Sequence, residues 1–134
     1  MRTAVDSSIL LDILVGDTNF ADQAENSLRL ASQSSALIVC ECVIAEVRPV
    51  LSDSEMDAFL NDLEIQFVPS TRASAMLAGK MMQTYLSRRA TAYARVIPDF
   101  IIGAHALLSA GRLLARDRGF YRDYFKGLQV ISPT

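Results

Sequence analysis

The amino-acid sequence predicts a single α/β domain, a three-layer α/β/α arrangement around a parallel sheet of roughly five strands. Short apolar runs alternate with segments of helical periodicity along the whole chain. The runs are continuously apolar, which is typical of parallel strands covered on both faces. With 134 residues, 51% of them hydrophobic, the chain has enough apolar material for one buried core. No linker or repeat divides it, so residues 1–134 are predicted to fold as one domain.

The first half of the chain begins with a strand and a helix. Residues 3–6 form a short apolar run that ends on Asp6, and Ser7 and Ser8 offer an N-cap for a helix that ends at Gly16. The later elements of this half are expected to be helices over residues 19–32, 41–47 and 52–63 and strands over residues 36–40 and 65–68.

The second half continues the same alternation. A long helix is predicted over residues 71–88, and a basic segment follows at residues 88–95. Pro98 and Asp99 begin a helix that should end at Gly111. A strand over residues 112–115, a helical turn over residues 120–125 and a strand over residues 128–131 complete the chain.

The composition argues against a membrane protein, a secreted protein and a zinc-binding protein. The longest apolar runs, such as residues 36–40, are far too short to cross a bilayer. No signal peptide is visible at the start, so we expect a cytoplasmic protein that does not bind membranes. Cys40 and Cys42, with His105 as the single histidine, fall short of the roughly four ligands of a zinc site. They are interpreted as buried, inert thiols.

Charge is distributed unevenly along the chain. Residues 1–67 carry twelve acidic side chains against three arginines, a net charge of −9. Residues 68–134 carry three acidic side chains against ten lysines and arginines, a net charge of +7. This asymmetry is compatible with a polyanionic partner at one face, and equally with a surface whose charges compensate one another.

Four acids occur where parallel strands end or where the adjoining helices begin. Asp6 ends the first strand, Glu46 lies one turn into the helix after the second, Asp99 begins a helix, and Asp117 follows the strand over residues 112–115. Ligands of open α/β sheets bind beyond the carboxyl ends of the strands. Clustered carboxylates repel one another, and Mg²⁺ or Mn²⁺, which prefer oxygen ligands, would relieve that repulsion.

Each acid also has a purely structural interpretation. Asp6 would cap the following helix, Glu46 would be solvated, Asp99 would interact with its helix dipole, and Asp117 would be an ordinary turn residue. Their shared placement at strand ends favours the metal site.

These segments resemble the PIN-domain family, and in particular its VapC-type toxins. The resemblance covers essentially the whole chain in the expected order. It is carried by Val5-Asp6-Ser7-Ser8, Ile44-Ala45-Glu46-Val47, the helix from Asp99 to Ala106, the segment from Arg112 to Tyr121 and the closing strand from Gly127 to Pro133.

The resemblance implies an Mg²⁺- or Mn²⁺-dependent endoribonuclease, commonly dimeric and neutralised by a VapB-type antitoxin. Its metal-binding and catalytic acids would be Asp6, Glu46, Asp99 and Asp117. One position departs from the family, since Ala115 stands where the family usually has Thr or Ser two residues before the fourth acid. Ser8, two residues after Asp6, can still provide a hydroxyl near the metal ligands.

The basic residues of the second half are candidates for RNA binding. Arg116 and Arg118 flank Asp117 and are expected at the mouth of the acid cluster, where they would hold phosphate. Arg88, Arg89 and Arg95 suit contact with the nucleic-acid backbone, with a solvated basic face as the alternative. The exposed apolar sides of the helices at residues 19–32 and 54–63 form a candidate antitoxin groove.

Other titratable residues are interpreted structurally. Glu41 is expected to interact with its helix dipole, Asp12 to lie on the surface and Asp123 to form a local ion pair. His105 is six residues beyond Asp99 on the same predicted helix, so it is expected to point away from the acids and to pack against neighbouring side chains.

Two rival functions follow from the same residues. The first is a catalytically silent PIN-like module that binds RNA or protein, which Ala115 favours. The second is a phosphotransfer or receiver-like domain, which needs a lysine at a later strand end. The only lysines, Lys80 and Lys126, lie at no predicted strand end.

Overall fold

The computed structural model describes residues 1–88 and 95–133. Its strands form one five-stranded sheet of order β3-β2-β1-β4-β5, and every neighbouring pair is parallel. The strands are β1 (Arg2–Val5), β2 (Ala36–Val39), β3 (Ile65–Phe67), β4 (Arg112–Leu114) and β5 (Gln129–Ile131). β1 therefore lies at the centre of the sheet, between β2 and β4.

Helices connect successive strands. They are α1 (Ser7–Val15), α2 (Thr18–Ser32), α3 (Glu41–Val47), α4 (Asp53–Asp62), α5 (Arg72–Arg88), α6 (Ile97–Ser109) and α7 (Arg118–Tyr124), with a short 3₁₀ turn, η1 (Arg48–Val50), after α3. Ser52 and Glu55 form a reciprocal capping box at the start of α4. Gly111 follows α6 with a φ of +87°, a left-handed conformation that glycine adopts without strain.

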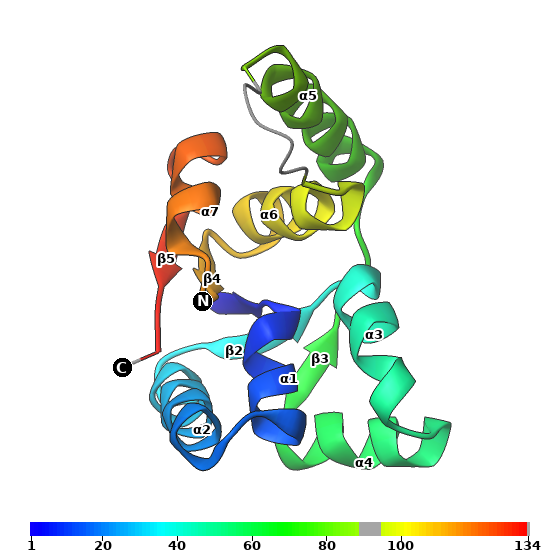
Figure 1. Ribbon diagram of the computed structural model, residues 1–134, viewed down its shortest axis with the longest axis vertical. Helices are drawn as coiled ribbons and strands as arrows, with labels where there is room; N and C mark the ends of the chain where they lie inside the picture. The colour runs from blue at the N-terminus through cyan, green and yellow to red at the C-terminus, as the bar shows by residue number, and fades with distance from the viewer. Residues whose placement is uncertain (89–94, 134) are drawn as a thin grey trace.

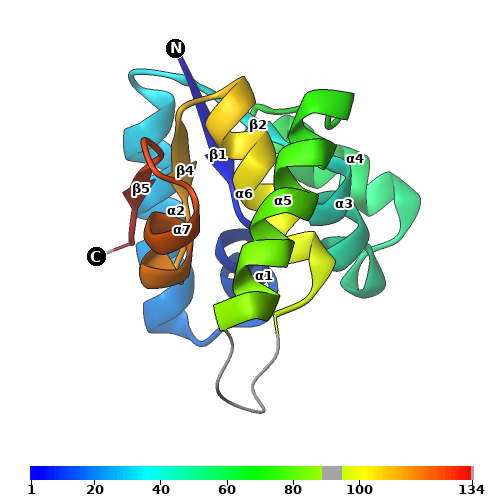
Figure 2. The same cartoon turned by 90° about the horizontal axis from the view of Figure 1, so that it is seen from above.

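The helices form two layers on opposite faces of the sheet. α1 and α2 cover one face, whereas α6 and α7 cover the other, with α5 packed on the outer side of α6 (Figures 1 and 2). α3 contacts both α1 and α6. The prediction of a three-layer α/β/α domain with a parallel sheet is confirmed.

The core lies between the sheet and these helices. The last three residues of both β1 and β2 are buried, as the continuous apolar runs predict. On α6, Gly103 allows close contact with Phe125, because a Cβ built on the glycine would lie 2.6 Å from two atoms of the Phe125 ring. The helix thus packs tightly on the segment that ends α7.

One local prediction was wrong. Asp6, and not Ser7 or Ser8, is the N-cap of α1, and its carboxylate accepts a hydrogen bond from the Ser8 backbone N–H. The helix therefore starts one residue after the strand. In the described part of the chain, no helix has the length and apolar character needed to cross a bilayer.

Candidate active site

The sheet order brings the ends of three strands side by side. β2, β1 and β4 are neighbours, and Val5 is in register with Leu114. The Asp6 backbone N–H continues this pairing, because it donates to the Leu114 carbonyl at 3.0 Å. Asp6 thus lies between the segment that leads to α3, which carries Glu46, and the segment that leads to Asp117.

Asp6 is a buried carboxylate held on both oxygens. The Tyr121 hydroxyl donates to Oδ1 at 3.0 Å, and the Ser8 hydroxyl donates to Oδ2 at 2.5 Å. Asp6 itself is only 8% exposed. Burial of a carboxylate is costly without such donors, so these two hydroxyls fix its position.

Glu46 on α3 lies near Asp6. The Ser7 hydroxyl donates to its Oε1 at 3.0 Å. Partial burial of the carboxyl group raises the pKa of Glu46, the Ser7 hydrogen bond opposes that rise, and the charges of Asp6 and Asp99 add to it. Glu46 is therefore within electrostatic range of both acids.

Asp99 lies in the first turn of α6. Burial raises the pKa of its carboxyl group, nearby Arg95 lowers it, and the charges of Asp6 and Asp117 raise it further. Asp99 is thus electrostatically connected to acids on either side. The four predicted acids are therefore linked electrostatically through Asp6 and Asp99.

Asp117, like Glu46, is an exposed acid. Its side chain is 45% exposed, and as the N-cap of α7 it makes no capping hydrogen bond. Its Oδ2 is instead paired with the Arg95 guanidinium. Ala115, two residues before Asp117, is fully buried.

The four acids have the oxygen ligands that a hard divalent cation prefers, but their side chains are not arranged around a single ion position. Carboxylate oxygens are the preferred ligands of Mg²⁺ and Mn²⁺. Burial is the main cause of the raised pKa of Glu46 and of Asp99, and a cation would relieve the smaller part that comes from neighbouring acids. Yet among the residues that the structure describes, no three His, Cys, Asp or Glu side chains lie close enough to hold one ion. A cationic group, Arg95, already contacts two of the acids.

The basic residues take different positions around this cluster. Arg118 is exposed beside Asp117, whereas the guanidinium of Arg116 points elsewhere. It pairs with Asp12 and lies over the Phe20 ring, 4.6 Å from the ring centre. The expected position of Arg116 at the mouth of the acid cluster is therefore not observed, although its role in RNA binding stays a prediction.

The two described ends of the basic segment lie on one aromatic cluster. Arg88 is over the Tyr124 ring at 5.4 Å, and Arg95 is over the Phe120 ring at 4.3 Å. Phe120 and Tyr124 contact each other on α7, next to Asp117. Arg89, the third arginine predicted to contact RNA, lies outside the described residues.

The remaining titratable residues behave mainly as structural groups. His105 is buried and donates from Nε2 to the Val68 carbonyl at 2.7 Å, and burial lowers its pKa, which agrees with the packed interpretation. Glu41 lies in the first turn of α3 and also accepts from the Ser70 backbone N–H.

Three smaller predictions need correction. Asp12 is not a free surface acid, because it pairs with Arg116 and its side chain is only 20% exposed. Asp123 makes no ion pair within residues 1–88 and 95–133. Cys40 is buried as expected, but Cys42 is only half-buried. Burial raises the pKa of the Cys42 thiol to about 11, so it is still unreactive at neutral pH.

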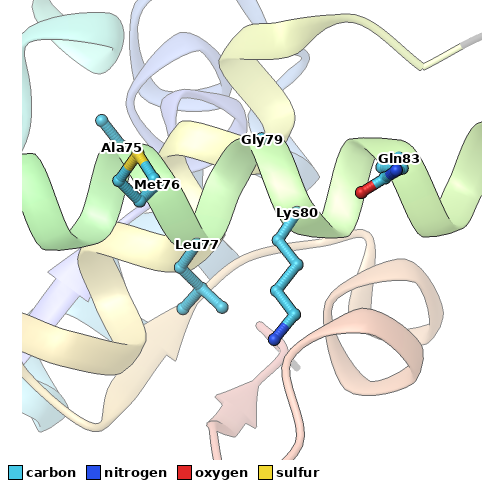
Figure 3. Close-up of a pocket in the computed structure, with 6 residues that line it drawn as sticks. All are labelled: Ala75, Met76, Leu77, Gly79, Lys80 and Gln83. Carbon is cyan, nitrogen blue, oxygen red and sulfur yellow. The ribbon is translucent and has the colours of Figure 1, made fainter.

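The hollows on the surface lie away from the acids. An open hollow of about 580 Å³ follows a single helix, α5, and is lined by residues between Ala75 and Gln83 (Figure 3). A hollow between α2 and the end of α4, of about 190 Å³, is lined partly by Glu25, Arg29 and Asp62. The second coincides with the predicted antitoxin groove but is more charged than the apolar surface expected there.

Ser7 and Tyr121 are the site residues that the sequence did not identify. Ser7 follows Asp6 directly, where the sequence pattern indicates only a helix cap. Tyr121 is four residues beyond Asp117, and a position one helical turn after the fourth acid is a signal for a side chain that faces the cluster. Nothing in the sequence indicates that Asp6 would be its partner.

Comparison with known proteins agrees with this fold. The sequence model of the PIN domain family matches residues 3–126, whereas no curated protein sequence matches the chain. A chain of the VapBC2 complex of Rickettsia felis, bound to a promoter DNA fragment, superposes with a TM-score of 0.70 at 14% identity over 100% of both chains. A toxin–antitoxin complex from Klebsiella pneumoniae gives 0.71 at 19% identity over 98% of each chain.

A third solved structure, VapC20 of Mycobacterium tuberculosis, is described as a toxin that cleaves the sarcin–ricin loop. It superposes with a TM-score of 0.59 at 16% identity, over 95% of this chain and 98% of that one. At such identities the three superpositions establish a shared fold, with the site to be argued from its own residues.

Proposed function

Because the chain belongs to the PIN-domain family, we propose that it is a divalent-metal-dependent endoribonuclease of the VapC type, the toxin of a toxin–antitoxin pair. One observation carries the proposal. Asp6, at the end of the central strand, is fixed by Ser8 and Tyr121 and lies within electrostatic range of Glu46 and Asp99. Three acids from three separate elements thus lie within electrostatic range of one another at the edge of the sheet where α/β proteins bind their ligands.

The residues of the site divide into ligands and positioning groups. Asp6, Glu46 and Asp99 would hold Mg²⁺ or Mn²⁺, and Asp117 would contribute from a more exposed position. A bound divalent ion supplies a water of lowered pKa and a positive charge beside the phosphodiester. Ser8 and Tyr121 orient Asp6, and Ser7 orients Glu46.

RNA would approach over the basic side of α7. Arg118 is exposed beside Asp117, and Arg88 lies on the same helix's aromatic cluster. Arginines near the acids would neutralise phosphates and hold them by paired hydrogen bonds. Arg89 and Arg95 belong to the same basic segment, while Arg116 would reach RNA only by leaving Asp12.

A cognate antitoxin is the expected partner, and a homodimer the expected state of the toxin. The neighbouring solved structures include toxin–antitoxin complexes, which supports the first expectation. Phe20 and Leu30 on α2 are 45% and 66% exposed, so this helix offers apolar contacts to a partner. Co-purification with the product of an adjacent small reading frame would identify the antitoxin.

Cleavage assays test the proposed activity. Purified protein should cut structured RNA in Mn²⁺ or Mg²⁺ and lose that activity in EDTA. Asp6→Asn, purified identically, controls for contaminating nucleases and should be inactive. Metal-independent cutting, or equal cutting by Asp6→Asn, would refute the proposed mechanism.

A catalytically silent binding module is the second candidate. Two observations favour it: Ala115 replaces a family hydroxyl, and the acids within the described residues are not arranged around one ion. A silent module would bind RNA equally well in EDTA and in Mn²⁺ without cutting it. Electrophoretic mobility and cleavage measured on the same samples separate the two functions.

A further inference from the structure

Arg95 lies between two of the acids. Its Nη1 is 3.8 Å from Asp99 Oδ2, and its Nη2 is paired with Asp117 Oδ2. The two acids come from different elements, since Asp99 begins α6 and Asp117 precedes α7. One guanidinium therefore joins two carboxylates of the proposed metal site.

The position of Arg95 is supported from several sides. Its backbone N–H donates to the Tyr85 hydroxyl on α5 at 2.9 Å. Its guanidinium lies over the Phe120 ring at 4.3 Å, a cation–π contact. The side chain is only 25% exposed. These contacts distinguish Arg95 from Arg118, which is exposed beside the same acid.

A guanidinium and a divalent ion cannot both occupy this place at low cost. Mg²⁺ requires its oxygen ligands at roughly 2.0–2.1 Å in near-octahedral geometry, so Asp117 Oδ2 could become a ligand only by leaving Arg95. Two cations a few ångströms apart also repel each other strongly in a partly buried site.

Resting on the proposed function, we infer that Arg95 is an internal counter-cation of the acid cluster. Its guanidinium and the divalent ion compete for Asp99 and Asp117, so metal binding displaces Arg95. The residue thereby weakens the affinity of the site for its metal. In the metal-free protein, Arg95 therefore positions the carboxylates of Asp99 and Asp117 and takes no part in the reaction itself.

Metal binding to variants tests this directly. Manganese affinity is measured by the electron paramagnetic resonance of free Mn²⁺ for the wild type, Arg95→Gln and Arg118→Gln. Arg118→Gln is the matched control, because it removes a positive charge beside Asp117 without breaking a described ion pair. Arg95→Gln should bind Mn²⁺ about tenfold more tightly than the wild type, whereas Arg118→Gln should change affinity less than about twofold.

A second readout needs no substitution. In the wild type, the Arg95 Nε–H resonance should shift as Mg²⁺ is added, in proportion to the occupied fraction of the site. The Arg118 resonance should shift much less.

Arg95→Lys, which keeps the charge but cannot bridge two carboxylates in the same way, should give an intermediate Mn²⁺ affinity. Melting followed by circular dichroism verifies that each variant is folded.

The outcomes separate this inference from the proposed function. If the wild type binds Mn²⁺ and Arg95→Gln binds it equally or more weakly, the competition is refuted and the metal site stands. If Arg118→Gln tightens binding as much as Arg95→Gln, net charge is the cause and the inference also fails. If neither the wild type nor Arg95→Gln binds Mn²⁺, both proposals fail together.

Discussion

The Tyr121 hydroxyl donates a hydrogen bond of 3.0 Å to Asp6 Oδ1, across 115 positions of the sequence. Burial raises the pKa of Tyr121 far above its usual range, and the charge of Asp6 adds to the rise. The phenol therefore stays protonated and acts only as a donor. It ties α7 to the end of β1 at the centre of the sheet.

Tyr121→Phe should impair both stability and activity. Removal of a buried hydrogen bond to a charged group costs about 1.5–3 kcal/mol, and Asp6 would become less well oriented for metal. We expect a lower free energy of urea unfolding and a several-fold higher Mn²⁺ concentration for half-maximal RNA cleavage.

Tyr124→Phe is the matched control for this hydrogen bond. Tyr124 is on the same helix and packs in the aromatic cluster, but its hydroxyl makes no hydrogen bond to any described residue. Its loss should leave both measurements nearly unchanged. Equal effects of the two variants would show that Tyr121 acts through ring packing alone.

Glu46→Gln should abolish cleavage and yet stabilise the metal-free protein at neutral pH. The pKa of Glu46 is raised above its ordinary 4.5, mainly by burial and further by Asp6 and Asp99. A carboxyl whose folded pKa is raised contributes stability that is fully present below the unfolded pKa and lost as pH rises through the folded pKa. The gain from Gln should therefore be absent below about pH 4.5 and grow as the pH rises above it, measured by urea unfolding in EDTA.

Glu55→Gln provides a comparison of opposite sign. Hydrogen bonds from Ser52 lower the pKa of Glu55 in the capping box, so its charge stabilises the fold above the unfolded pKa. This variant should lose stability at neutral pH and little at acid pH. A destabilising Glu46→Gln at neutral pH would mean that the Ser7 hydrogen bond outweighs the repulsion.

Asp117→Asn should reduce cleavage without eliminating it. The Asp117 side chain is 45% exposed, against 26% for Asp99, and Mg²⁺ commonly uses only one or two protein carboxylates. We expect a higher Mn²⁺ requirement with substantial residual activity at saturation. A variant as inactive as Asp6→Asn at saturating Mn²⁺ would show that the four acids are equivalent.

Ala115→Ser tests the missing hydroxyl. Ala115 is fully buried, so the larger Thr would risk overpacking at a cost of about 1–3 kcal/mol, whereas Ser adds a single oxygen. If the hydroxyl helps to hold the metal, Ala115→Ser should lower the Mn²⁺ concentration for half-maximal cleavage. If the folded variant needs the same Mn²⁺ concentration as the wild type, the missing hydroxyl at position 115 does not affect metal binding.

Two helix glycines should respond in opposite ways to alanine. Gly103→Ala would place a Cβ against the buried Phe125 ring and should destabilise the fold by about 2–3 kcal/mol. Gly79→Ala adds a Cβ with nothing within 4 Å and should stabilise α5 by about 0.5–1 kcal/mol. Urea unfolding of both variants measures the difference, and changes of the same sign would contradict this account of α6 packing.

The order of strands and helices was predictable because it depends on local patterns. Continuous apolar runs such as residues 36–39 mark buried parallel strands, and Gly111 marks the end of α6. The four acids could be grouped because parallel strands present their carboxyl ends at one edge. The N-cap of α1 was ambiguous, since Asp6, Ser7 and Ser8 all suit that position.

The partners of individual side chains were not predictable from the same patterns. Arg116 and Asp117 are adjacent, yet one pairs with Asp12 on α1 and the other with Arg95 before α6. Both residues lie in the irregular segment between β4 and α7, so closeness in sequence did not imply a shared site. The partners lie 104 and 22 positions away, beyond the reach of any periodicity.

The strand order also determines when the site can come into existence during translation. Asp6 and Glu46 leave the ribosome early, but Asp99, Asp117 and Tyr121 follow much later, and β1 gains its second neighbour only when β4 has emerged. A growing chain thus carries half of its acids without the groups that complete and orient them. In the proposed nuclease, the contact of Tyr121 with Asp6 would therefore form only after residue 121 has emerged, near the end of synthesis.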